Sequence, residues 1–108
     1  MGESPRGEGV RDLEEVRGSD WSRATWAVPS EDDSLVLVRQ SLTTRGGSEV
    51  VWRVPAQRLP ELCGLVAAPT SDAAGLLDWA EEDPERLDAL VEGLETMDPP
   101  VVDDLSLS

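Results

Sequence analysis

The spacing of apolar residues along this 108-residue chain changes at Pro55, and that change limits the folds that the chain can adopt. Before Pro55, apolar residues recur at every second position, which is the period of a β-strand with one buried face. After Pro55, they recur at every third or fourth position, which is the period of an amphipathic helix. A group of strands followed by a group of helices is typical of the α+β class.

Three strands are predicted between residues 21 and 54. The first alternates through Ala24, Trp26 and Val28, and the third alternates over residues 49–54. Residues 35–38 between them are all apolar, which is typical of a central strand that is covered on both faces.

The connection between the second and third strands sets which residues share a face. Residues 43–48 include two glycines and predict a hairpin turn. With a three-residue loop, Val38 and Leu42 lie on the same face as Val54 and Val50. The opposite face then carries Leu35, Leu37 and Val51, which, if left uncovered, form a natural surface for a homodimer.

Three helices are predicted after Pro55. Pro60 fits in the first turn of the first helix, and Asp72 is a suitable N-cap for the second. Asp83 followed by Pro84 predicts the start of the third. Each helix has one apolar stripe, and the stripes are Leu59, Leu62, Cys63 and Val66; Ala73, Leu76, Leu77 and Ala80; and Leu87, Leu90, Val91 and Leu94, continued by Met97.

The sequence therefore predicts an α+β fold in which a three-stranded antiparallel meander is followed by three short amphipathic helices packed on one sheet face. A single domain is expected over residues 20–98, because a chain of this length supports one core. Residues 1–19 are rich in Gly, Ser, Glu and Arg and are expected to be flexible, apart from one short helical turn at residues 12–16. Residues 99–108 are expected to form an acidic C-terminal tail.

The residue types that the chain lacks argue against an enzyme. Without His or Lys, it has neither the usual general base, nor the commonest neutral metal ligand, nor the amine of a Schiff base. A Walker phosphate loop and the Ser-His-Asp and Cys-His arrangements are excluded for the same reason. The single cysteine, Cys63, lies on an apolar stripe and is expected to be a buried, inert thiol. No catalytic residue, metal site or cofactor is predicted.

The net charge of −14 indicates the kind of partner that the chain can bind. Residues 1–54 hold ten acidic and seven basic residues, net −3, whereas residues 55–108 hold thirteen acidic and two basic residues, net −11. We expect a basic protein partner, with a transcription regulator as one candidate, and no direct binding of nucleic acid or of a membrane. Because no signal peptide or long apolar span is recognised, a cytoplasmic location is expected.

The acidic residues of the second and third predicted helices lie opposite the apolar stripes. Such a face is either the solvated side of an amphipathic helix or a docking surface for a basic partner. Trp21, at the start of its strand, is the tryptophan most expected to be exposed, whereas Trp26, Trp52 and Trp79 are expected to fill the core. The candidate partner-binding residues are Trp21, Asp78, Glu81, Glu82, Glu85, Asp88, Glu92 and Glu95.

Part of the chain also resembles a known family. Residues 36–41, with the sequence VLVRQS, are followed by a Gly-containing turn, a strand, and Pro55-Ala56 leading into a helix that reaches Gly64. This order resembles the small actinobacterial domain family that accompanies helix-turn-helix regulators of development and secondary metabolism. Gln40 replaces the usual Asp of that family, residues 21–23 retain little of its Trp-Arg-Lys-Ser-Ser segment, and residues 70–108 have no counterpart. The resemblance implies a non-enzymatic regulatory partner.

These observations lead to two main hypotheses. The first is a non-enzymatic, acidic regulatory or adaptor protein that binds a basic protein surface, with a homodimer through the sheet as one arrangement. The alternative is an inhibitor of immunity or nucleic-acid-mimic type that blocks a toxin, nuclease or polymerase. A structural or assembly component is a third hypothesis, which predicts a large oligomer.

Overall fold

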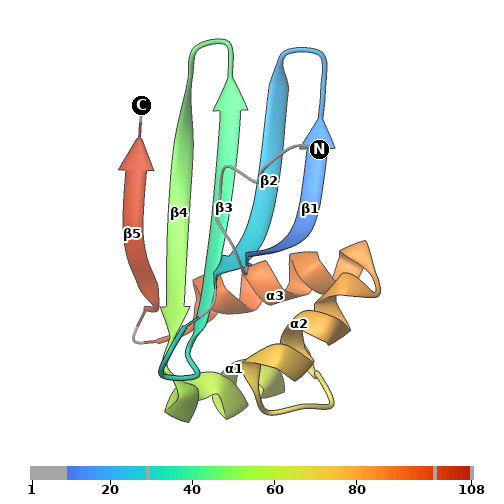
Figure 1. Cartoon of the computed structure of the whole chain (residues 1–108), viewed down its shortest axis with the longest axis vertical. Helices are drawn as coiled ribbons and strands as arrows, with labels where there is room; N and C mark the ends of the chain where they lie inside the picture. The colour runs from blue at the N-terminus through green and yellow to red at the C-terminus, as the bar shows by residue number, and fades with distance from the viewer. Residues whose placement is uncertain (1–9, 29, 99, 108) are drawn as a thin grey trace.

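The computed structural model describes residues 10–28, 30–98 and 100–107. Its five antiparallel strands form one sheet in sequence order, and three α-helices follow the fourth strand in the chain (Figure 1). The elements are β1 (Arg11–Arg17), β2 (Trp21–Val28), β3 (Leu35–Thr43), β4 (Gly46–Val54), the 3-10 turn η1 (Ala56–Arg58), α1 (Leu59–Val66), α2 (Ala73–Glu81), α3 (Pro84–Thr96) and β5 (Val102–Leu107). The predicted α+β class is confirmed.

The three predicted strands correspond to β2, β3 and β4, and β3 is the central strand of the sheet. Residues 35–38 of β3 are all buried, as the continuous apolar run predicts. Leu35 and Leu37 pack among the helices, and Val36 and Val38 point to the other face because side chains alternate along a strand. Trp26 is the cross-strand partner of Val38 and is buried with it on that second face.

The prediction of a flexible segment over residues 1–19 is wrong for its described part, because residues 11–17 form β1. Val10, Leu13 and Val16 recur at every third position, so the segment lacks the alternation typical of a strand. The pairing register shifts between Asp12 and Glu14, as at a β-bulge, and one extra residue there breaks the alternation of the strand. Residues 1–9 lie outside the described residues.

The prediction of a free C-terminal tail over residues 99–108 is also corrected. Residues 102–107 form β5, which pairs with β4 at the edge of the sheet. The amide of Arg53 donates to the carbonyl of Val101 at 2.9 Å, next to this pairing. Backbone hydrogen bonds at a sheet edge accept almost any side chain, so an acidic sequence does not prevent the pairing. Residues 99 and 108 lie outside the described part of the chain.

The predicted register of the β3–β4 hairpin is wrong by one residue. Thr43 pairs with Gly46, so the turn contains only Thr44 and Arg45. The Thr43 hydroxyl donates to the Gly46 carbonyl at 3.0 Å and accepts from the Arg45 amide at 3.2 Å, and Gly46 has a positive φ of 142°. A shift of one residue moves side chains to the other face. Accordingly, Leu35 and Leu37 face the helices instead of forming a homodimer surface.

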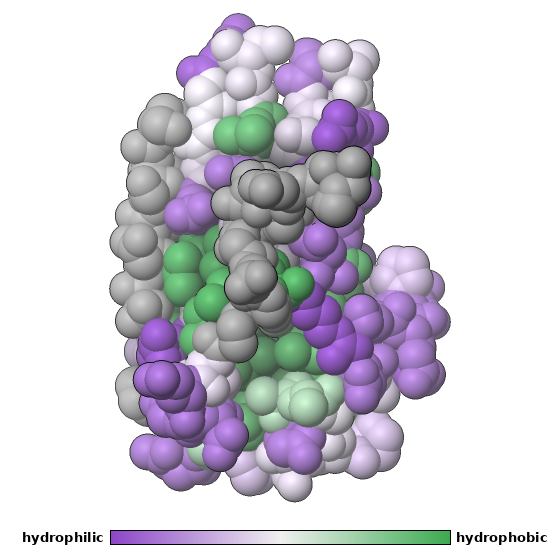
Figure 2. Space-filling model, viewed as in Figure 1, coloured by the Kyte–Doolittle hydropathy of each residue, from purple (hydrophilic) through white to green (hydrophobic). Residues whose placement is uncertain are grey.

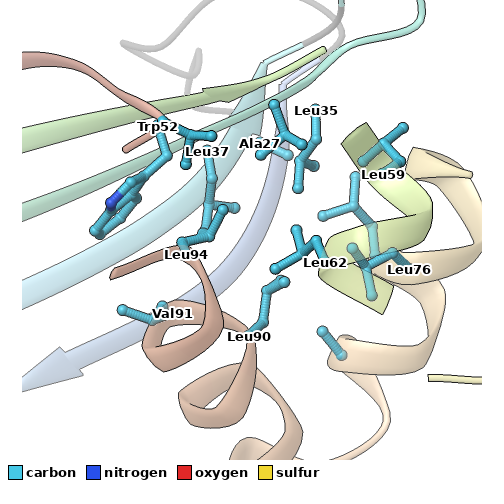
Figure 3. Packing of buried hydrophobic residues seen from close by; sticks show 14 of the residues in the cluster. Ala27, Leu35, Leu37, Trp52, Leu59, Leu62, Leu76, Leu90, Val91 and Leu94 are labelled. Carbon is cyan, nitrogen blue, oxygen red and sulfur yellow. The ribbon is translucent and has the colours of Figure 1, made fainter. Parts of the chain in front are cut away.

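The helices cover one face of the sheet at one end, and the β1–β2 and β3–β4 hairpins project beyond them (Figure 1). Leucines from all three helices meet Leu35 and Leu37 from the sheet (Figure 3). Asp72 caps α2 by accepting from the Gly75 amide at 2.7 Å, as predicted for that position. Asp83 likewise caps α3 by accepting from the Glu85 amide at 2.9 Å. Among the described residues, no helix is long and apolar enough to cross a membrane.

Two helical glycines provide a matched test of this packing. A Cβ at Gly93 on α3 would lie 2.9 Å from Cγ1 of Val66 and 3.2 Å from Cδ1 of Leu62, whereas a Cβ at Gly64 meets nothing within 4 Å. Gly64→Ala should raise the free energy of unfolding by about 0.5–1 kcal/mol, because glycine is a poor helix former. Gly93→Ala should lower it by about 1 kcal/mol, because overpacking between α1 and α3 exceeds the gain in helix propensity.

Urea denaturation followed by tryptophan fluorescence measures both changes. The close contact between α1 and α3 is contradicted if the two substitutions shift stability in the same direction and by the same amount.

Candidate partner-binding surface

Four carboxylates form a line along the outer side of α3. The helix buries Leu87, Leu90, Val91, Gly93 and Leu94, so the opposite side faces away from the core. The line, called here the acidic stripe, consists of Glu85, Asp88, Glu92 and Glu95. Intervals of three, four and three residues place them over about 15 Å of one helix face. All four residues are exposed.

The acidic stripe has no ion pair with any residue in the described ranges, whereas the carboxylates of α2 are paired. Arg11 of β1 lies 2.5 Å from Asp78 and 2.6 Å from Glu81. Its pKa is raised, mainly by the hydrogen bond to Glu81 and then by the one to Asp78. These two predicted contact residues therefore connect the edge strand β1 to α2.

Glu82 also has a partner within the chain. Arg86 lies 3.1 Å from Glu82, and its guanidinium is 5.4 Å from the ring centroid of Trp79. Arg86 also donates to the backbone carbonyl of Trp79 at 3.3 Å. Glu82 therefore belongs to the junction between α2 and α3, where a cation stacks on an aromatic ring.

Trp21 is the exposed tryptophan, as the sequence predicts, with 45% of its surface accessible. Its indole lies against Gly18, where an added Cβ would be 2.0 Å from Nε1. Trp21 begins β2 at the hairpin end of the sheet, opposite the end that the helices cover (Figure 1). The structure therefore separates Trp21 from the seven predicted carboxylates and does not bring the eight residues together.

A cluster that the sequence did not predict lies on the helix-side face of the sheet. Glu14 of β1 accepts from Arg23 Nε at 3.1 Å and Nη2 at 3.0 Å, and from Arg39 Nη2 at 3.3 Å. Thr25 completes the cluster, because its hydroxyl donates to Glu14 at 3.3 Å and accepts from Arg39 Nε at 3.0 Å. The side chains of Glu14 and Arg39 are only 15% and 17% exposed. No sequence signal indicated this cluster, because β1 itself was not predicted.

Charges of the acidic stripe influence the pKa of Arg39 in this cluster. Burial lowers the pKa of Arg39, and repulsion by Arg23 lowers it further. Glu14, Asp88 and Glu95 oppose that change. Two members of the stripe, Asp88 and Glu95, thus act on an arginine of the sheet.

Other reactive groups lie in the core. Cys63 is buried, and burial raises the pKa of its thiol, with a further contribution from Asp72. The buried Nε1 of Trp52 has no hydrogen-bond partner in the described part of the chain. Within the same ranges, no group of three or more Cys, Asp or Glu side chains is arranged to hold a metal ion.

Comparisons with protein-family models, with curated proteins and with solved structures give no match to this chain.

The role of Glu14 is testable against its neighbour. Glu14→Ala should lower the free energy of unfolding by about 1–2 kcal/mol, because Arg23 and Arg39 lose the carboxylate between them. Glu15→Ala should change it by less than about 0.5 kcal/mol, because the Glu15–Arg17 pair is exposed and screened by water. Equal effects in urea denaturation would show that the cluster does not hold β1 on the sheet.

Proposed function

We propose that this protein is a non-enzymatic regulatory or adaptor protein that binds a basic protein surface through the acidic stripe. One observation carries the proposal. The stripe presents four exposed carboxylates without an ion pair among the described residues, although Asp78 and Glu81 of α2 and its C-cap Glu82 are all paired with arginines.

The charges of the stripe destabilise α3 in the unbound protein, which supports a role in binding. Like charges at spacings of three and four residues on one helix face repel one another, by about 0.2–0.5 kcal/mol per pair. Glu92 and Glu95 also lie near the C-terminus of α3, where the helix dipole disfavours negative charge and where no basic residue occurs in the last turn. A partner that supplies Lys or Arg side chains removes both penalties when it binds.

The rest of the chain agrees with recognition in place of catalysis. Its second half carries a net charge of −11, which attracts basic surfaces over a distance of about one Debye length. The absence of His and Lys removes the usual acid–base and nucleophilic groups. The resemblance to domains that accompany helix-turn-helix regulators supports the same proposal.

The regular spacing of the stripe also favours the alternative of a nucleic-acid mimic. Four negative charges in a line of about 15 Å resemble a short row of phosphates along one strand of a nucleic acid. In that case, DNA or RNA would compete with this chain for its target, whereas an adaptor would bind its partner alongside nucleic acid.

A pair of matched variants tests the proposal. Glu85→Arg together with Glu92→Arg changes the net charge by four units and leaves in place Asp88 and Glu95, the two stripe residues that oppose the lowering of the Arg39 pKa. The control is Asp20→Arg together with Glu49→Arg, which changes the net charge equally at sites away from α3. The first variant should still fold, because a basic residue at 92 near the helix C-terminus offsets one at 85 near its start.

The measurement is capture of the native partner from a cell extract at low salt, followed by elution with a salt gradient. The α3 variant should capture at least about tenfold less partner, and the control should stay within about twofold of the unmodified chain. An equal loss of captured partner in both variants would show that only the net charge matters. Undiminished capture by the α3 variant would show that the stripe is not part of the interface. Addition of DNA then separates the adaptor from the mimic.

A further inference from the structure

A cavity of about 620 Å³ lies between the β2–β3 connection and the first turn of α2. Its lining includes apolar side chains from three parts of the core, which are Ala27 and Leu35 of the sheet, Leu59 of α1 and Leu77 of α2. The volume falls in the range of about 300–1,000 Å³ that is usual for ligand pockets. These elements lie at the helix-covered end of the molecule (Figure 1), and apolar surface also gathers in the middle and lower part of the face seen in Figure 2.

The rim of this cavity is acidic. Asp33, from the β2–β3 connection, and Asp72, the N-cap of α2, both line it. An adjoining cavity of about 380 Å³ shares Val28, Ser30 and Val36 with the first and is lined by Glu31 and Asp32. Because they share lining residues, the two cavities adjoin each other; together they are called here the groove, which is lined by apolar side chains and by the carboxylates of Glu31, Asp32, Asp33 and Asp72.

Residues 30–34 of the β2–β3 connection, called here the acidic loop, are held by hydrogen bonds. Asp32 accepts from the Ser30 hydroxyl and, at 3.2 Å, from the Ser34 amide. These hydrogen bonds lower the pKa of Asp32 to about 2, and the one from Ser30 has the largest effect. The carboxylate of Asp32 is therefore charged at neutral pH. Asp33 follows with a positive φ of 63°, a conformation that Asp adopts more readily than most residues.

The basic residues of the groove leave its rim negative. Arg11 lines the larger cavity, but its guanidinium already binds Asp78 and Glu81. Arg53 lines the smaller cavity as a single positive charge beside Glu31 and Asp32. An anionic ligand would be repelled, and an uncharged apolar ligand would leave the carboxylates unused.

We propose that the groove binds an extended segment of a basic protein, with one leucine-sized side chain in the larger cavity and flanking Lys or Arg side chains against the acidic loop and Asp72. An apolar anchor within a charged rim is the arrangement in which a few residues supply most of the affinity of an interface. This inference rests on the proposed function, since the same basic partner supplies the segment, but it assigns that partner a second contact away from the acidic stripe.

The direct test is an NMR titration of the ¹⁵N-labelled full chain with the peptide acetyl-Arg-Arg-Leu-Arg-Arg-amide. Two control peptides replace either the leucine by serine or all arginines by glutamine. Amide shifts should map to Ala27, Leu35, Asp33 and Ala73. Each control peptide should bind at least about fivefold more weakly, because one lacks the apolar anchor and the other lacks the charges.

Two variants complete the test. Ala74→Leu fills the mouth of the cavity from an exposed position on its lining and should abolish the shifts at these four residues. Gly64→Leu adds the same side chain on α1, where an added Cβ meets nothing within 4 Å, and should leave the titration unchanged. Thermal unfolding confirms that both variants are folded before the titration.

The outcomes separate this inference from the proposed function. Shifts confined to the acidic stripe, shifts that persist in Ala74→Leu, or no shifts at millimolar peptide each overturn the groove proposal, and none of them affects capture of the native partner through α3. Conversely, shifts in the groove that disappear in Ala74→Leu support the groove proposal. Normal capture of the partner by the Glu85→Arg, Glu92→Arg variant would overturn only the proposed role of the acidic stripe.

Discussion

The structure depends on the packing of Leu35 and Leu37 of β3 against the helices. The two-residue turn of the β3–β4 hairpin pairs Leu35 with Val54 and Leu37 with Trp52, so four large apolar side chains enter the same core. Complete burial of such a side chain contributes about 1.5–3 kcal/mol. A loop longer by one residue would place these leucines on the face opposite Val54 and Trp52, so the four side chains would no longer share one core.

The position of the acidic stripe follows from this core. Each helix directs its apolar stripe to the core, so the charged residues of α3 lie on its remaining sides. The helices cover only one end of the sheet (Figure 1), and a cluster of polar side chains lies on the same face of the sheet. In this cluster, Arg23 and Arg39 both donate hydrogen bonds to the carboxylate of Glu14. Asp88 and Glu95 of the stripe also act on the charge of Arg39.

Elements that bury a regular apolar pattern were predictable from the sequence. The run at residues 35–38, the stripe of α3 and the caps at Asp72 and Asp83 all appear in the structure, because burial and capping act on local spacing. The edge strands β1 and β5 were not predictable in this way. Their pairing depends on backbone hydrogen bonds, and in β1 on a bulge that disguises the alternation, so their sequences carry little signal.

The candidate site was predictable only in part, for a related reason. Amphipathic spacing placed the acidic residues on the outer side of α2 and α3, but it could not show which of them have partners. Asp78 and Glu81 bind Arg11 of a strand that was not expected, and Glu82 binds Arg86. Pairing with Arg11 and Arg86 thus divides one uniformly acidic surface into a paired part on α2 and its C-cap and an unpaired stripe on α3.

Carboxylate footprinting of the native complex shows whether the partner covers the acidic stripe. Carbodiimide coupling of glycine ethyl ester, read by mass spectrometry, measures the accessibility of each carboxylate in the free chain and in the chain bound to its captured partner. If the partner binds the acidic stripe, Glu85 and Glu92 are protected in the complex, whereas Asp20 and Glu49 are modified equally in both states. Unchanged modification of the stripe, together with protection elsewhere, would contradict recognition through α3.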